Sequence, residues 1–213
     1  MLPYIQAPKP AERLVIKGSV ALVGNSDALA GKHKGKEIDS HDTVFRFNLA
    51  RVGPSYVDAV GKKVSYFLFS RMVTLKTIDD DLEFKWFKQI CSKVRVICYP
   101  EYAEKVMPYQ PNPFFLMTDI ADCNHVFNKL LGHNKHEFPK VNHPRNGIKL
   151  LACLVSAGVV PSLFGFDTEE REDNNHYFDD ETQIESEHVG HKPSIEYGLL
   201  KELDERGFIR LVK

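Results

Sequence analysis

The stretch from Val20 to Asn48, VALVGNSDALAGKHKGKEIDSHDTVFRFN, decides the fold, because a Gly-Asn-Ser turn follows its first apolar run and a second run ends it. The run Val20 to Val23 predicts a short strand buried on both faces of a parallel sheet. Gly24 permits a sharp turn, and Asn25 and Ser26 place small polar side chains where a helix can begin. Open α/β sheets bind ligands outside the carboxyl ends of their strands. The turn is therefore a candidate nucleotide site, although many turns from a strand to a helix contain Gly and Asn only because their backbone conformation requires them.

The rest of the chain alternates between β-rich apolar runs and stretches of helical periodicity. This alternation predicts an α/β fold, a doubly wound and mostly parallel sheet with helices on both faces. We expect an extended segment at residues 1–18 and a single domain at 19–213. The expected strands are Val20 to Val23, Thr43 to Phe47, Val64 to Phe69, Val94 to Tyr99, Ser162 to Phe166 and Phe208 to Val212. The expected helices are Leu82 to Cys91, Ala121 to Leu131, Gly147 to Ala157 and Pro193 to Glu205.

Composition narrows the class of partner. The chain has 213 residues, 43% of them hydrophobic, and a formal net charge of -1, which gives no indication of a nucleic-acid partner. We find no apolar stretch long enough for a transmembrane segment and no signal-peptide core at the N-terminus. A peripheral membrane contact stays open.

The second half of the opening stretch, EIDSHDTVFRFN, adds a more specific signal. Together with the strand and its turn, it resembles the large sialylmotif of glycosyltransferase family 29, the sialyltransferases. The family pattern is a strand, Val-Gly-Asn-Ser, a spacer, Glu-Ile-Asp-Ser-His-Asp and then Val-x-Arg-x-Asn, all in this order here. The resemblance implies a Rossmann-like, GT-A-like fold in which Asn25 and Asn48 contact the phosphate and sugar of CMP. We expect Asp39 to Asp42 to form only a polar turn.

The small sialylmotif of that family begins Pro-Ser/Thr-x-Gly and ends in Gly-Phe. Here Pro144 to Gly147 leads through an apolar helix to Gly165 and Phe166, and the resemblance places Asn146 and Gly147 beside the nucleotide. Arg145 departs from the family's hydroxyl residue. Its guanidinium either meets a phosphate or carboxylate directly or stands in solvent at the helix start, and the sequence leaves both open.

Two shorter motifs follow in the family's order, His-Tyr-aromatic-acid at His176 to Asp179 and His-x4-Glu at His191 and Glu196. The unperturbed pKa of histidine lies near 6.5, so a histidine can act as base or acid near neutrality. By resemblance His191 is the general base, Glu196 orients nearby groups and His176 stabilises the departing phosphate. The implied nucleotide-binding set is Gly24, Asn25, Ser26, Asn48, Asn146, Gly147, Gly165, Phe166 and Tyr177.

The resemblance implies a glycosyltransferase that moves sialic acid, or a related keto-sugar acid such as Kdo, from a CMP-sugar donor to a glycan hydroxyl. The CMP-sugar is a donor substrate, and we expect no cofactor and no metal. The alternative is a CMP-binding protein of the same fold without transferase activity, which the altered Pro-Arg-Asn-Gly and the small size raise. Met72 to Lys140 matches no motif, so the acceptor stays open.

We reject three metal sites. His188 and His191 flank Gly190, which favours a loop, and lack a convincing third ligand. The acidic run Asp79 to Asp81 fits the first turn of a helix. Surface loop positions are expected for His133, His136 and His143.

The cysteines have no paired spacing and are predicted to be small buried hydrophobes: Cys91, Cys98, Cys123 and Cys153. In animal relatives, the resemblance implies a disulfide between the large and small sialylmotifs, at the positions of Val20 and Gly158 here. Loss of both partners suits a reducing compartment. We therefore expect a cytoplasmic enzyme of bacterial or viral kind.

Two regions are expected to shape access to the site. The polar segment Asp167 to Glu187 is predicted to be a mobile loop that orders over bound nucleotide. Tyr99, Tyr102 and Tyr109 are candidates for stacking on sugar faces, whereas Trp86 is expected to fill the core.

Overall fold

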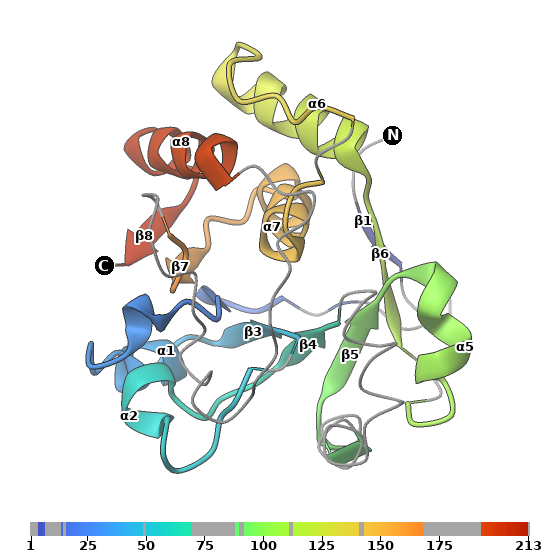
Figure 1. Ribbon diagram of the computed structural model, residues 1–213, viewed down its shortest axis with the longest axis vertical. Helices are drawn as coiled ribbons and strands as arrows, with labels where there is room; N and C mark the ends of the chain where they lie inside the picture. The colour runs from blue at the N-terminus through green and yellow to red at the C-terminus, as the bar shows by residue number, and fades with distance from the viewer. Residues whose placement is uncertain are drawn as a thin grey trace.

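One sheet organises the computed structural model, which describes residues 4–6, 14, 16–48, 50–69, 88–89, 92–110, 113–140, 143–167 and 193–212. Within these residues, strands pair in the order β1-β6-β5-β4-β3-β2-β7-β8 (Figure 1). The strands are β1 (Tyr4–Gln6), β2 (Val20–Val23), β3 (Thr43–Phe47), β4 (Tyr66–Leu68), β5 (Arg95–Cys98), β6 (Phe114–Met117), β7 (Ser162–Phe164) and β8 (Arg210–Val212). The helices are η1 (Asp27–Leu29), α1 (Gly35–Asp39), α2 (Val57–Val60), η2 (Pro100–Tyr102), α5 (Ala103–Val106), α6 (Ile120–Leu131), α7 (Asn146–Ser156) and α8 (Pro193–Glu205).

The strand order confirms the doubly wound α/β prediction. Strands from β6 to β8 pair in parallel, and β1 alone among the described strands pairs antiparallel, with β6. The chain runs outward from β2 through β3, β4, β5 and β6, then returns to place β7 on the other side of β2. This reversal creates a topological switch point between β2 and β7, where such sheets bind ligands.

The predicted strands and helices agree with the structure apart from their ends and two additions. All six predicted strands are present, while β1 and β6 were not predicted. The division at residue 18 stays a prediction, although β1 lies before it. Predicted helices at α6, α7 and α8 are confirmed. The predicted helix Leu82 to Cys91 lies outside the described residues except at 88–89, which are helical.

Alternating residues of the central strands bury their side chains in separate clusters. Leu22 and Phe45 belong to the large cluster that includes α6, α7 and α8 side chains, whereas Val23 and Val44 pack with Ile38 of α1. Figure 1 shows α6, α7 and α8 on one side of the sheet and α1 and α2 on the other. The sheet is therefore covered on both faces, as a parallel sheet requires.

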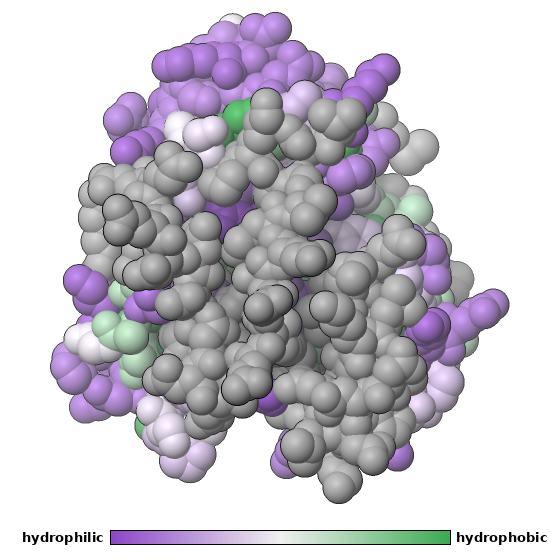
Figure 2. All heavy atoms as spheres, in the orientation of Figure 1, coloured by the Kyte–Doolittle hydropathy of each residue, from purple (hydrophilic) through white to green (hydrophobic). Residues whose placement is uncertain are grey.

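The helices on the larger face differ in what surrounds them. Seven of the α7 side chains are buried, consistent with a helix packed between the sheet and its neighbours: Ile148, Leu150, Leu151, Ala152, Cys153, Leu154 and Val155. α6 buries one stripe only, and the surface at the top of the view, over α6, is hydrophilic (Figure 2). Across the described residues, no helix has the length and apolar character needed to cross a membrane.

The cysteine prediction is confirmed where it can be followed. Cys98, Cys123 and Cys153 are buried, and Cys91 lies outside the described residues. Val20 is buried at the start of β2, and Gly158 adopts φ +78° after α7. The reducing, cytoplasmic setting inferred from these positions stays a prediction.

The predicted polar turn is confirmed at Ser40 to Asp42, which connect α1 to β3. Asp39 instead ends α1, and its carboxylate accepts hydrogen bonds from the main chain of Lys62 and Lys63. The prediction that Tyr99 and Tyr102 stack on sugar faces is wrong. Tyr99 and Tyr102 are buried members of the large cluster rather than open stacking surfaces, because both follow the buried strand β5.

The turn after β2 packs against the end of β7 with no spare room. Gly24 N–H donates to the Phe164 carbonyl at 2.7 Å, and a Cβ atom at Gly24 would lie 2.2 Å from the Gly165 carbonyl oxygen. Only glycine permits this approach of two backbones without displacement.

Replacing Gly24 is therefore expected to destabilise the fold. Gly24→Ala must push the two turns apart, and we expect a loss of about 1–3 kcal/mol in the free energy of unfolding, measured with urea. Gly53→Ala is the matched control, because its added Cβ meets nothing within 4 Å. Equal stability of the two variants would contradict this account of the switch point.

Candidate functional site

The candidate site lies at the carboxyl edge of the sheet, where β2 and β7 end. Ser26 accepts a hydrogen bond from Ala28 N–H at 3.2 Å and so caps η1, and its hydroxyl donates to Asp167 Oδ1 at 2.7 Å. The helix expected after the Gly-Asn-Ser turn is therefore only a short 3-10 turn. The turn after β2 and the turn after β7 are joined by this side-chain bond as well as by the backbone.

Asn25 and Asn48 are brought together as predicted, because β2 and β3 pair in parallel. Asn25 Nδ2 donates to the Phe47 carbonyl at 3.1 Å, so the donor end of this amide holds the end of β3. Its Oδ1 is buried without a hydrogen-bond partner among the described residues. Asn25 thus offers an acceptor, which matches a hydroxyl or amino group of a ligand and not a phosphate oxygen.

Asn48 stands in a backbone conformation that few residue types adopt readily. Its φ is +51°, and its N–H donates to the Leu68 carbonyl at 2.9 Å. Asparagine tolerates the left-handed region better than most non-glycine residues. The conformation turns the chain away from β3 at the carboxyl edge, beside Asn25.

The first turn of α7 reaches the same edge. Asn146 Oδ1 accepts a hydrogen bond of 2.7 Å from the hydroxyl of Tyr99, which follows β5. At Gly147, an added Cβ would lie 2.7 Å from the Phe166 ring, and that ring meets Phe47 edge-on at 6.2 Å. The predicted Gly147, Gly165 and Phe166 are therefore in one packed unit that positions α7 over the strand ends.

Arg145 is held by Glu196 of α8, a partner that the sequence did not reveal. The main-chain N–H of Arg145 donates to Glu196 Oε1 at 2.7 Å, and its Nε pairs with Oε2. Glu196 is only 1% exposed, whereas 36% of the Arg145 side chain is exposed. Of the two alternatives, solvation at the helix start is wrong, and the carboxylate that Arg145 meets is the protein's own.

The negative charge of Glu196 stabilises the positive charge of Arg145. Burial acts to lower the pKa of the Arg145 guanidinium, but the negative charge of Glu196 and the hydrogen bond to it outweigh burial and raise the pKa. The guanidinium carbon also lies 6.0 Å from the Tyr197 ring centroid. Glu196 therefore holds the residue that precedes α7, and its predicted role in catalysis stays a prediction.

The other predicted catalytic residues lie outside the described residues. These are His176 and His191. Tyr177 of the predicted nucleotide-binding set also lies outside them, as do His188, Trp86, Asp79 to Asp81 and all of the expected mobile loop except Asp167. Their roles stay predictions.

His133 and His136 lie in the loop after α6, as predicted, but both are partly buried because they pair with Glu202 of α8, and His143 is exposed. His133 Nε2 lies 2.8 Å from Oε1, and His136 Nε2 lies 2.9 Å from Oε2. Lys135 N–H donates to His133 Nδ1, which assigns the ring proton of His133 to Nε2. Arg206 adds a third hydrogen bond to Glu202 at 2.6 Å. The described residues contain no group of three metal-binding side chains.

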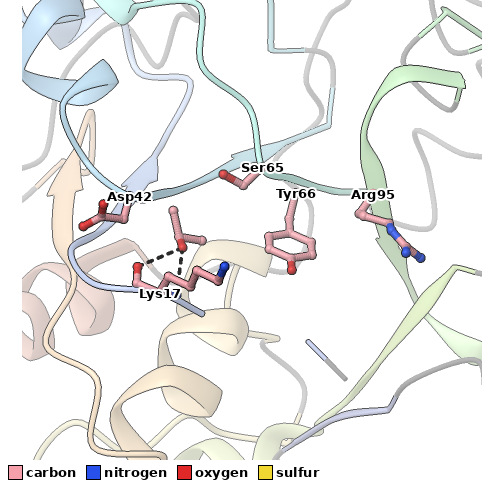
Figure 3. A pocket seen from close by; sticks show the side chains of 6 residues that line it. Lys17, Asp42, Ser65, Tyr66 and Arg95 are labelled. Carbon is pink, nitrogen blue, oxygen red and sulfur yellow. Dashed lines mark hydrogen bonds between the residues drawn. The ribbon is translucent and has the colours of Figure 1, made fainter. Parts of the chain in front are cut away.

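A groove of about 320 Å³ lies at the opposite edge of the sheet (Figure 3). Thr43, Tyr66 and Arg95 line it from the amino ends of β3, β4 and β5. Thr43 Oγ1 donates to the Lys17 carbonyl at 3.1 Å, and Asp42 accepts from the main chain and hydroxyl of Ser19, which lowers the pKa of Asp42. Thr43 and Asp42 of this groove therefore form hydrogen bonds with the main chain. The groove lies at the amino ends of the strands, whereas α/β sheets of this kind bind nucleotides at the carboxyl ends.

Comparison with known proteins identifies the family. The model of glycosyltransferase family 29 (sialyltransferase) matches residues 16–208. The α-N-acetylgalactosaminide α-2,6-sialyltransferase 1 of Gallus gallus is 26% identical over 247 aligned residues, which cover 96% of this chain and 43% of the relative. The Homo sapiens protein of the same name is 24% identical, covering 90% of this chain and 37% of the relative. The chain thus spans less than half the length of these relatives.

Solved structures show the same fold. A mammalian sialyltransferase in complex with Gal-beta-1-3GalNAc-ortho-nitrophenol has a TM-score of 0.59 and 19% identity, covering 92% of this chain and 69% of that one. The apo α-2,3-sialyltransferase from Campylobacter jejuni has a TM-score of 0.53 and 16% identity, covering 93% and 77%.

The Arg145–Glu196 pair gives an asymmetric stability prediction. Arg145→Met leaves the buried carboxylate of Glu196 without its cation, and we expect a loss of about 3–5 kcal/mol in the free energy of unfolding. Glu196→Gln costs less, because the guanidinium is partly exposed and can reach water. The double variant Arg145→Met/Glu196→Gln should be more stable than Arg145→Met alone in urea titrations. A double variant as unstable as the sum of both would refute the pairing.

Glu202 gives a prediction of pH dependence. Hydrogen bonds from His133 and His136 lower the pKa of Glu202 from its ordinary 4.5 to about 2. The stabilising effect of the carboxylate is therefore present above pH 4.5 and lost as pH falls towards 2. Glu202→Gln should lower the melting temperature at pH 7, and the difference from wild type should shrink below pH 4.5. Glu205→Gln, an exposed change on the same helix, should show little difference at any pH.

Proposed function

The chain belongs to glycosyltransferase family 29, the sialyltransferases, and we propose that it transfers sialic acid from CMP-sialic acid to a hydroxyl group of a glycan. The proposal rests on one observation above others. Gly24, Asn25 and Asn48 of the large motif and Asn146 and Gly147 of the small motif meet at the carboxyl edge beside the switch point. This is where doubly wound sheets bind nucleotides.

The polar groups at this edge suit a cytidine nucleotide. The buried Oδ1 of Asn25 can accept a hydrogen bond from a ribose hydroxyl or from the cytosine amino group. Asn146 keeps its donor end for an acceptor, since Tyr99 occupies its Oδ1. Donor and acceptor ends at one edge favour a ligand that carries both hydroxyl groups and an anion.

The chemistry requires an anionic leaving group and a deprotonated acceptor. CMP leaves as a phosphate, and hydrogen-bond donors aimed at its oxygens stabilise the charge that develops. We assign His176 to this task and His191 to the removal of the acceptor proton, because the family motifs imply both roles. Glu196 positions the start of α7 through Arg145. On this proposal the reaction needs no metal.

The acceptor is proposed only as a class. The relatives are named for transfer to α-N-acetylgalactosaminides, and one solved neighbour holds Gal-beta-1-3GalNAc-ortho-nitrophenol. These two glycans are therefore the first acceptors to test. CMP-Kdo is the donor to compare with CMP-sialic acid, since both carry the same nucleotide and a carboxylate at the anomeric carbon.

Removing the proposed base should abolish transfer but not nucleotide binding. We expect His191→Ala to lower kcat by roughly 10²- to 10⁴-fold, because general-base catalysis contributes about that much, while the Kd for CMP is retained. His125→Ala is the matched control, since His125 is an exposed α6 residue. Transfer is measured with CMP-sialic acid or CMP-Kdo and the two glycans, with and without EDTA.

Three results would count against parts of this proposal. Equal rates for His191→Ala and wild type would refute the assigned base. Loss of wild-type transfer in EDTA, restored by a divalent metal, would refute metal independence. CMP binding without transfer from either donor to any glycan would favour the binding protein without transferase activity.

A further inference from the structure

Tyr99, Asn146 and Lys149 form a polar group where α7 meets the end of β5. Tyr99 is 9% exposed, and its hydroxyl donates to Asn146 Oδ1 at 2.7 Å. A side-chain amide has one acceptor end and one donor end. Because Tyr99 occupies the acceptor end, Asn146 presents Nδ2, and no described residue accepts a hydrogen bond from it. Tyr99 therefore decides which end of this amide a ligand meets.

Lys149 lies one helical turn after Asn146, on the same face of α7. Its ammonium is 5.0 Å from the Tyr99 ring centroid, a cation–π distance. The side chain is half-buried, and no carboxylate among the described residues forms an ion pair with it. Burial lowers the pKa of Lys149, although Glu101 and Asp119 oppose this from further away. A partly desolvated cation that forms no ion pair among the described residues favours an anionic ligand.

The position of this group relates it to the donor site. Gly147, next to Asn146, packs on Phe166 beyond β7, and Tyr99 directly follows β5. The first turn of α7 thus lies along the carboxyl edge, between the ends of β7 and β5. Asn25 follows β2 and Asn48 follows β3, and both strands lie between β5 and β7 in the sheet. The donor groups of Asn146 and Lys149 therefore belong to the edge at which the nucleotide is proposed to bind.

We propose that Asn146 Nδ2 and Lys149 Nζ together bind an oxyanion of the CMP-sugar donor, and that Tyr99 is the positioning residue that turns Asn146 for this contact. The inference rests on the proposed function and goes beyond it by naming the groups that meet the donor's negative charge. The oxyanion is either the phosphate of CMP or the carboxylate of the sugar. Lys149 and Asn146 touch the donor; Tyr99 acts only through Asn146.

Three probes separate the two sources of negative charge. Cytidine carries neither anion, CMP carries the phosphate, and a C3-fluorinated CMP-sialic acid that resists transfer carries both. Calorimetry on the full chain gives the Kd of each. Lys149→Met should raise the Kd of the probe that carries the bound oxyanion roughly 10- to 100-fold, because it removes a charged hydrogen bond. Tyr99→Phe should raise it roughly 3- to 10-fold, while the ring and its packing remain. Neither variant should change the Kd of cytidine.

Controls separate the site from the fold. Lys62→Met makes the same change of charge near the amino edge of the sheet, and Tyr66→Phe deletes the phenolic hydroxyl of a tyrosine that is as buried as Tyr99. Both should leave all three Kd values unchanged. Tyr99→Phe should have no further effect in an Asn146→Ala background, because the hydroxyl acts through Asn146. In transfer assays, Tyr99→Phe should raise KM for the donor more than it lowers kcat.

Every outcome decides the inference. If the variants bind CMP and the fluorinated donor more weakly but cytidine equally well, the inference is supported and the oxyanion is the phosphate. If only the fluorinated donor binds more weakly, the inference is supported and the oxyanion is the carboxylate. Equal weakening of cytidine and CMP, or variants that match wild type on all probes, overturns it. A wild-type chain that binds CMP while the variants match it overturns this inference alone. A wild-type chain that binds none of the probes overturns the proposed function as well.

Discussion

The contact between two backbone turns at the centre of the sheet is the constraint on which the site depends. Gly24 N–H bonds the Phe164 carbonyl at 2.7 Å, with no space for a side chain between Gly24 and Gly165. β2 and β7 are distant in sequence, so this contact fixes the relation between the large and the small motif. Ser26 and Asp167 repeat the connection through their side chains. The residues proposed to bind the donor are positioned from this point outward.

The second connection is the ion pair between α7 and α8. A buried ion pair adds little stability compared with apolar packing, because desolvation offsets the attraction between the charges. Its main effect is geometric, since Glu196 accepts from both the main chain and the side chain of Arg145. The family's hydroxyl at this position is thus replaced by a longer side chain whose partner comes from a different helix. The start of α7 is fixed even though the motif is altered.

Local patterns in the sequence were sufficient for the parallel core of the fold but not for its edge. β2 and β3 are continuous apolar runs next to turns, which periodicity identifies directly. β1 has only three residues, which is too short a pattern to predict a strand, and its pairing with β6 is long-range. β6 is an apolar run of four residues like β2, so its local pattern was sufficient although the strand was not predicted. The contacts of Glu196 and Glu202 could not be predicted from local sequence either, since each side chain pairs with residues far away in the chain. Tyr99 was assigned to sugar stacking because sequence alone gives no burial.

Hydrogen bonds within the protein decide which end of each amide the described site offers to a ligand. Asn25 Nδ2 donates to the Phe47 carbonyl, and Asn146 Oδ1 accepts from the Tyr99 hydroxyl. One amide therefore offers an acceptor and the other a donor, and neither can reverse without losing a bond inside the protein. A nucleotide meets both demands, because its ribose and base donate hydrogen bonds and its phosphate accepts them. An uncharged sugar could meet the first amide but would offer no anion to the ammonium of Lys149, which forms no ion pair within the described part of the chain. The orientation of two side-chain amides thus favours a charged nucleotide donor on grounds independent of the motifs.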